Sequence, residues 1–121
     1  MKEIKIQSTI YVFDTLEELP KDIVLLMNKA IEAREKAYAP YSNFNVGAAL
    51  LLDNNEIITG SNQENASYPS GLCAERTAIY YANSQYPNNR IVRMAISAGS
   101  KKNKTASPIP PCGACRQTIA E

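Results

Sequence analysis

The 121 residues of the chain are enough for one domain with a modest core, and we expect a single domain over residues 1–121. With 45% hydrophobic residues, 21% charged residues and a net charge of +1, the sequence is that of a globular protein, without the charge that would favour nucleic acid or an anionic membrane as a partner. No apolar stretch approaches the roughly 20 residues that span a bilayer, and the N-terminus lacks the pattern of a signal peptide, so we expect a cytoplasmic protein.

The first half of the chain predicts a strand, a helix and a hairpin. Apolar residues alternate over residues 3–13, which indicates a half-buried strand. Between 23 and 38 they recur at three- and four-residue steps, which predicts a helix of roughly 16–18 residues that ends before Pro40. The continuous apolar run 46–52 predicts a central strand, and residues 56–62 predict the strand that returns beside it.

The second half predicts two more helices with a strand between them. One helix begins at about Cys73, a strand covers residues 91–99, and a short helix begins at Cys112 after a loop over residues 99–111. The element order β-α-β-β-α-β-α predicts the α/β class, as a three-layer α/β/α sandwich around a mixed sheet.

Three cysteines lie at the starts of the last two predicted helices: Cys73, Cys112 and Cys115. Helix N-termini present free N–H groups and the positive end of a dipole, which favour thiolate over thiol. Structural zinc sites are usually closed by four protein ligands, whereas this chain has three cysteines and no histidine. The open coordination position would hold water whose pKa zinc lowers towards ~7, so the pattern predicts a catalytic zinc ion.

Glu75 lies two residues after Cys73 and is predicted to be the proton shuttle for that water. Residues two apart on a helix point ~200° apart, so both can address one metal only if the helix begins at Cys73, give or take a residue. Three thiolates and Zn²⁺ sum to a charge of −1, which the helix N-termini and a guanidinium, from Arg76 or Arg116, would offset.

Each of these residues has a plainer interpretation when it is taken alone. Cys73 is then a small buried hydrophobe, Glu75 a first-turn acid that favours the helix dipole, and Arg76 a surface residue. Cys112 and Cys115 have the spacing of a redox pair. A non-catalytic zinc-stabilised protein and a thiol redox protein therefore stay open, although two cysteine motifs that both begin helices favour catalytic zinc.

The same residues resemble a known family, the zinc-dependent cytidine and deoxycytidylate deaminases. The resemblance rests on CAER at 73–76 and PCGAC at 111–115, and it extends over AYAPYSNFNVGAALL at 37–51 and TGSNQENASY at 59–68. The three-cysteine set without histidine is similar to the small cytidine deaminases, which are usually homotetramers. Against that family, the strand over residues 3–13 is an addition, and the C-terminal strands of the family are absent from this sequence.

The resemblance implies hydrolytic deamination of cytidine and deoxycytidine to uridine and deoxyuridine, with release of ammonia, in pyrimidine salvage. It implies that Cys73, Cys112 and Cys115 hold one Zn²⁺ per chain. Glu75 would take the proton of zinc-bound water and deliver it to N3, the hydroxide would attack C4, and Glu75 would protonate the departing amine. The alternative within enzymes is a deaminase of a related aminated nucleoside, such as a cytosine-containing antibiotic.

The resemblance also implies which residues contact the nucleoside: Phe44, Asn62, Glu64, Tyr68 and Ala74. Asn62 and Glu64 are similar to a pair that hydrogen-bonds the ribose hydroxyls, and Phe44 to an aromatic residue that lines the pyrimidine pocket. Tyr68 is similar to a residue that reaches the site of a neighbouring subunit, and Arg76 to an arginine that hydrogen-bonds the zinc thiolates. Without the resemblance, Asn62 and Glu64 would be interpreted as ordinary loop residues and Phe44 as a core residue.

Overall fold

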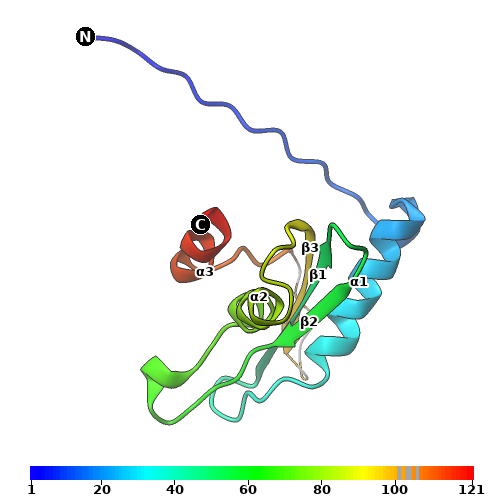
Figure 1. Cartoon of the computed structure of the whole chain (residues 1–121), viewed down its shortest axis with the longest axis vertical. Coiled ribbons are helices and arrows are strands. Elements are labelled where there is room, and N and C mark those ends of the chain that lie inside the picture. The colour runs from blue at the N-terminus through cyan, green and yellow to red at the C-terminus, as the bar shows by residue number, and fades with distance from the viewer. Residues whose placement is uncertain (101, 103–104, 106) are drawn as a thin grey trace.

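The helices and strands lie in three layers in the computed structural model, which describes residues 1–100, 102, 105 and 107–121 (Figure 1). The middle layer is a sheet in the order β2-β1-β3, and α1 and α2 cover its two faces. Four residues of the predicted loop over 99–111 lie outside the described part of the chain. The elements are η1 (Leu16–Glu18), α1 (Lys21–Arg34), β1 (Phe44–Leu52), β2 (Ile57–Ser61), η2 (Tyr68–Ser70), α2 (Ala74–Gln85), β3 (Ile91–Ser100) and α3 (Gly113–Ala120).

The central strand β1 is buried on both faces because a helix packs on each. Ala48 and Leu50 point to one side and pack in a cluster with Ala78 of α2. Ala49 points to the other side and packs with Ala30 of α1. The continuous apolar run of β1 is therefore explained, and the predicted central strand is confirmed.

Two glycines allow the helices to approach the sheet closely. A Cβ atom on Gly47 would lie 2.0 Å from the backbone oxygen of Ala30 in α1. A Cβ atom on Gly60 would lie 2.6 Å from the backbone nitrogen of Ala78 in α2. Since a side chain cannot fit in either place, α1 lies directly against the backbone of β1, and α2 against that of β2.

The described sheet is antiparallel throughout, whereas the sequence predicted a mixed one. β1 pairs with β2 in a hairpin, and β1 also pairs antiparallel with β3. β2 and β3 run in the same direction and are joined through α2, but β1 lies between them. The α/β class is confirmed, and the parallel strands are not neighbours because the hairpin partner separates them.

The strand predicted over residues 3–13 is wrong. This segment forms no strand or helix and extends away from the rest of the molecule (Figure 1). Its apolar residues Ile4, Ile6, Ile10 and Val12 are exposed. A strand needs a neighbour for its backbone hydrogen bonds, and no described segment pairs with this one, so the alternating pattern alone does not produce a strand.

α1 is shorter than the periodic pattern predicts, because it ends at Arg34 rather than near Tyr38. The backbone of Tyr38 pairs with another segment: its N–H donates to the carbonyl of Asn62 at 3.0 Å, and its carbonyl accepts the N–H of Glu64 at 2.8 Å. Both groups are then unavailable for a helix. The prediction failed because these partners lie more than twenty residues away in the sequence.

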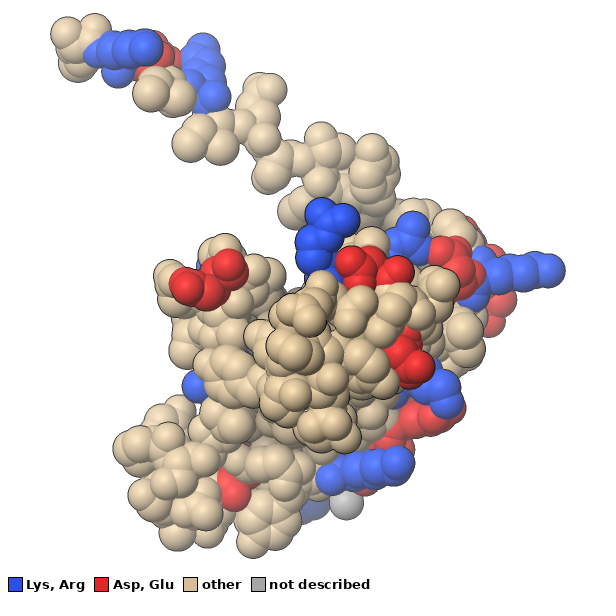
Figure 2. All heavy atoms as spheres, in the orientation of Figure 1, with Lys and Arg blue, Asp and Glu red and all other residues tan. Residues whose placement is uncertain are grey.

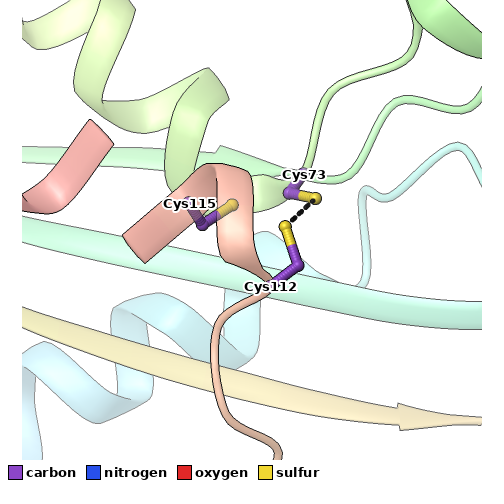
Figure 3. A group of neighbouring side chains, drawn as sticks. All are labelled: Cys73, Cys112 and Cys115. Atoms are coloured by element: carbon purple, nitrogen blue, oxygen red, sulfur yellow. Dashed lines mark hydrogen bonds between the residues drawn. The ribbon is translucent and has the colours of Figure 1, made fainter. Parts of the chain in front are cut away.

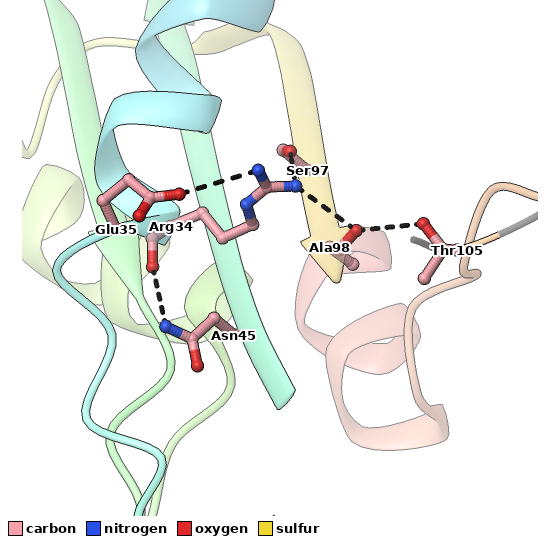
Figure 4. A network of polar contacts seen from close by, with 6 residues as sticks. All are labelled: Arg34, Glu35, Asn45, Ser97, Ala98 and Thr105. Atoms are coloured by element: carbon pink, nitrogen blue, oxygen red, sulfur yellow. Dashed lines mark hydrogen bonds and ion pairs between the residues drawn. The ribbon is translucent and has the colours of Figure 1, made fainter. Parts of the chain in front are cut away.

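Polar contacts fix the last turn of α1 on the sheet (Figure 4). Nη1 of Arg34 donates to Oγ of Ser97 at 3.1 Å and to the carbonyl of Ala98 at 3.5 Å, both in β3. Nδ2 of Asn45 in β1 donates to the carbonyl of Arg34 at 3.3 Å. The end of α1 is therefore held by two strands, on the sheet face opposite to α2.

Charged side chains of both signs lie close together on the face that Figure 2 shows. They gather mainly on the right-hand side of the body, where basic and acidic residues are mixed and form no large patch of one sign. Among the described residues, none of the helices has the length and apolar character needed to cross a membrane.

Candidate metal centre and adjoining cavity

Three thiols meet where α2 and α3 begin (Figure 3). Cys73 is the N-cap residue of α2, Cys112 is that of α3, and Cys115 lies in the first turn of α3. Their Sγ atoms all lie within 4.8 Å of one another, and those of Cys73 and Cys112 are 3.7 Å apart. Two sulfur ligands of tetrahedral zinc, each at ~2.3 Å from the metal, lie about 3.8 Å apart, so this thiol cluster fits a zinc ion.

The two thiols of α3 have different surroundings. Cys112 is exposed, and the backbone N–H of Cys115 is the main cause that holds the pKa of the Cys112 thiol below its ordinary value. Cys115 is fully buried, and this burial raises the pKa of its thiol to about 12. A buried thiol becomes a thiolate when a cation compensates its charge, which is the condition that a bound metal ion meets.

Arg76 provides a positive charge beside the thiol cluster. Its Nη2 donates to Sγ of Cys73 at 3.6 Å, and hydrogen bonds to Cys73 and then Cys115 raise the pKa of its guanidinium. Arg116, the other predicted candidate, is exposed and donates its Nε to the carbonyl of Pro111 at 3.0 Å. The structure therefore brings Arg76, and not Arg116, to the thiols.

Glu75 is a buried acid in the first turn of α2, with 5% of its surface exposed. The predicted helix boundary is confirmed: α2 begins at Ala74, and Cys73 precedes it in an extended conformation with φ −69° and ψ 157°. Burial is the largest cause of the raised pKa of the Cys115 thiol, and the charge of Glu75 is a smaller cause that acts in the same direction. Glu75 therefore lies near the thiol cluster, at the start of α2.

An open cavity of about 810 Å³ adjoins the thiol cluster. Cys73 and Arg76 lie in its wall, together with three of the predicted substrate contacts: Asn62, Glu64 and Tyr68. The other two predicted contacts are not lining residues of this cavity. Phe44 is half-buried at the start of β1, and Ala74 is fully buried at the start of α2.

Backbone pairing places the cavity residues beside the thiols. The N–H of Gln63 donates to the carbonyl of Leu72 at 2.9 Å, and the N–H of Leu72 donates to the carbonyl of Gln63 at 3.0 Å. Leu72 immediately precedes Cys73. Residues 62–64 are therefore fixed next to the start of α2, although about ten residues of chain separate them from it.

The side chain of Asn62 is hydrogen-bonded to the backbone at the start of β1. Its Oδ1 accepts the N–H of Val46 at 2.8 Å, and its Nδ2 donates to the carbonyl of Phe44 at 2.9 Å. The side chain of Asn62 is thus hydrogen-bonded to the backbone through both ends of its amide. The sequence pattern gave no indication of this second role.

The carboxylate of Glu64 binds the loop before β1. Its Oε1 accepts the N–H groups of Tyr41 and Ser42 at 3.0 and 3.1 Å, and its Oε2 accepts the hydroxyl of Ser42 at 2.6 Å. We call Asn62, Glu64 and Ser42 the polar clamp. Sequence reasoning missed Ser42, because a serine in a loop carries no periodic signal and its partner lies 22 residues away.

Comparison with known proteins agrees with this site. Residues 20–121, which include the thiol cluster, Glu75 and the polar clamp, match the family model of the cytidine and deoxycytidylate deaminase zinc-binding region. The cytidine deaminases of Halalkalibacterium halodurans and Sporosarcina psychrophila are 50% and 45% identical over 83% of this chain, and over 71% and 69% of their own lengths.

Solved structures of cytidine deaminases share the fold. The crystal structure of the Burkholderia pseudomallei protein superposes with a TM-score of 0.71 at 46% identity, covering 80% of this chain and 73% of that one. The structure of the Mycobacterium tuberculosis protein gives a TM-score of 0.70 at 37% identity, covering 83% and 76%.

Proposed function

Because this chain belongs to the cytidine and deoxycytidylate deaminase family, we propose that it catalyses the hydrolytic deamination of cytidine and deoxycytidine. The products would be uridine or deoxyuridine and ammonia. The observation that carries this proposal is the thiol cluster, whose Sγ atoms lie within 4.8 Å of one another beside the buried Glu75. A metal site with three protein ligands, next to a buried acid, has the composition of a catalytic centre.

The thiol cluster has the donor chemistry for one zinc ion per chain. Three thiolates and Zn²⁺ carry a net charge of −1, which Arg76 and the N-termini of α2 and α3 offset. A bound zinc ion would supply a Lewis acid that lowers the pKa of water in its open position towards ~7.

Glu75 is proposed to move every proton of the reaction. It takes a proton from the attacking water and gives it to N3 of the pyrimidine, which makes C4 electrophilic. The water oxygen then bonds to C4. Glu75 next takes the proton of the new C4 hydroxyl and transfers it to the amino group. The C4–N4 bond breaks as the C4=O bond forms, and ammonia leaves. One carboxylate suits both transfers, because C4 reacts poorly until N3 is protonated and an amide ion cannot leave unprotonated.

The nucleoside is proposed to lie in the cavity beside the thiols. Asn62 and Glu64 would bind the sugar hydroxyls, and their places in the cavity wall support this role. Phe44 and Ala74 would contact the pyrimidine from the starts of β1 and α2. Tyr68 is 90% exposed, which is compatible with a residue that reaches the site of a neighbouring subunit in a homotetramer. The tetramer, the single domain, the cytoplasmic location and the salvage role stay predictions.

The test is to incubate the purified protein with cytidine and to follow the loss of the cytosine absorbance band, with zinc measured on the same sample. We expect ammonia release and one zinc per chain. A folded protein that holds zinc but turns over neither cytidine, deoxycytidine nor a cytosine-containing antibiotic nucleoside would contradict the proposal. A reversible disulfide between Cys112 and Cys115, without bound metal, would favour the redox alternative.

A further inference from the structure

The Glu64 carboxylate has most of its hydrogen-bonding capacity occupied by its own chain. A carboxylate offers about four lone-pair positions, two on each oxygen. The backbone N–H groups of Tyr41 and Ser42 occupy the two positions of Oε1, and the Ser42 hydroxyl occupies one position of Oε2. One acceptor position on Oε2 therefore remains for a ligand in the cavity that Glu64 lines.

The Ser42 hydroxyl is itself oriented by the backbone. Asn43 adopts the left-handed conformation, with φ 54°, which an asparagine tolerates. The tight turn there lets the N–H of Phe44 donate to Oγ of Ser42 at 3.1 Å. Because Oγ accepts this hydrogen bond, its own hydrogen is free to point at Oε2 of Glu64, 2.6 Å away.

We propose that Ser42 is a positioning residue for nucleoside binding, whose hydroxyl fixes the Glu64 carboxylate so that one acceptor position faces a sugar hydroxyl. This inference rests on the proposed function, since it takes the ligand of the cavity to be a nucleoside. The backbone donors hold Oε1 alone. Without the Ser42 hydroxyl, Oε2 loses its partner, and the carboxylate can turn about the remaining contacts.

The charge state of Glu64 is compatible with this role. The Ser42 hydroxyl is the largest of the causes that hold the pKa of the Glu64 carboxyl below its ordinary value. An ionised carboxylate is an acceptor only, so it can receive a hydrogen bond from a sugar hydroxyl and does not donate one.

Uridine binding, measured by NMR titration, tests the role of Ser42 without requiring turnover. We expect Ser42→Ala to raise the Kd of uridine about tenfold, as for the loss of one hydrogen bond to a charged group. In cytidine turnover, KM should rise by a similar factor while kcat stays within about twofold, because the lost contact is made equally in ground and transition states.

A double-mutant cycle shows whether Ser42 acts through Glu64. Glu64→Ala should weaken uridine binding at least as much as Ser42→Ala, and adding Ser42→Ala to it should change the Kd by less than about twofold. A tenfold effect of Ser42→Ala that persists in the Glu64→Ala background would overturn the proposal, as would an unchanged Kd in Ser42→Ala alone.

Two further variants separate the hydroxyl from the fold. Ser42→Thr keeps the hydroxyl and should bind uridine within about threefold of the wild type. If it binds as weakly as Ser42→Ala, the hydroxyl is not the group that matters. Ser67→Ala, at an exposed serine whose Oγ accepts a hydrogen bond from Ser70, is the matched control and should bind uridine normally.

The outcomes also separate this inference from the proposed function. A wild-type chain that binds uridine but deaminates no cytidine would contradict the proposed function and would still test Ser42. A wild-type chain that binds no uridine would contradict both. If Ser42→Ala lost its zinc or its thermal stability, Ser42→Thr would decide the question by the same titration.

Discussion

The thiol cluster and the polar clamp lie side by side but are built in different ways. The thiol cluster depends on the first turns of two helices, which fix where each sulfur points. The polar clamp depends on hydrogen bonds from the segment after β2 to the loop before β1 and to the first residues of β1, about twenty residues away in the sequence. Substitution in the thiol cluster should therefore act through the loss of zinc, whereas substitution in the polar clamp should affect nucleoside binding and stability with zinc retained.

The largest effect is expected at a zinc ligand. Cys115→Ala removes a fully buried thiol and leaves two ligands, so we expect zinc binding and deamination to be lost. Zinc per chain, measured by atomic absorption after dialysis, checks this. Thr118→Ala on the same helix is the matched control and should retain zinc. A Cys115→Ala variant with one zinc per chain and normal turnover would remove Cys115 from the ligand set.

Glu75→Gln should have the next largest effect on turnover, but unlike Cys115→Ala it should retain zinc. The amide keeps the size of the side chain but cannot carry a proton, so we expect kcat to fall about 10³-fold while zinc stays bound. Steady-state kinetics and a zinc assay on one preparation measure both. Glu56→Gln, at an exposed glutamate beside the hairpin turn, should leave kcat unchanged. Near-normal turnover in Glu75→Gln would end its assignment as proton shuttle.

Asn62→Ala should show the mixed effect that distinguishes the polar clamp. It removes the hydrogen bonds to Val46 and Phe44, so we expect the free energy of unfolding to fall by about 1–3 kcal/mol. We also expect KM for cytidine to rise about tenfold, with zinc retained. Urea unfolding and kinetics measure these changes. Zinc loss in this variant would show that the polar clamp also supports the thiol cluster, and so would contradict the distinction between the two regions.

Asn62→Asp refines the same test. The carboxylate can still accept the N–H of Val46 but cannot donate to the carbonyl of Phe44. We expect it to be no more stable than Asn62→Ala, because it places a negative charge against that carbonyl. A variant as stable as the wild type would show that the bond to Phe44 contributes little.

The smallest effect is expected from deletion of residues 1–12. This segment contacts neither the thiol cluster nor the polar clamp and extends away from both (Figure 1). We expect zinc content and kcat to be unchanged, and Tm to shift by no more than a degree or two. A fall in Tm of several degrees would show that these residues pack against something in solution.

The thiol cluster and the polar clamp also differ in how much of each could be predicted from the sequence. The start of α2 was predicted, because the spacing of Cys73 and Glu75 is compatible with one metal only at a helix boundary. The start of α3 was predicted from Pro111, which precedes the second cysteine motif. The end of α1 and the contacts of Ser42 were not, because each depends on a partner that local periodicity does not identify. Local chemistry predicts the groups of a site, whereas distant backbone partners determine how they are held.

The N-terminal segment shows the limit of periodicity in another way. Residues 3–13 have the alternation of a strand, yet no described neighbour completes their hydrogen bonds. In β1 a similarly apolar run becomes a strand because β2 and β3 lie on either side. The amino acids alone do not distinguish these two situations, since a strand is a property of a pair of segments.

The few contacts of α3 mean that a bound metal ion would also affect the stability of the fold. Cys115 is the one buried residue of this eight-residue helix. The contact between α3 and α2 includes a hydrogen bond of 3.4 Å between the hydroxyl groups of Tyr80 and Thr118. A zinc ion shared by Cys73 and Cys112 would join positions 39 residues apart in the folded chain. Its binding free energy would add to the stability of the fold, because the unfolded chain does not hold the thiols together. The ion would then act as a cross-link as well as a reagent, and a chelator should release the last helix of the described chain together with the chemistry.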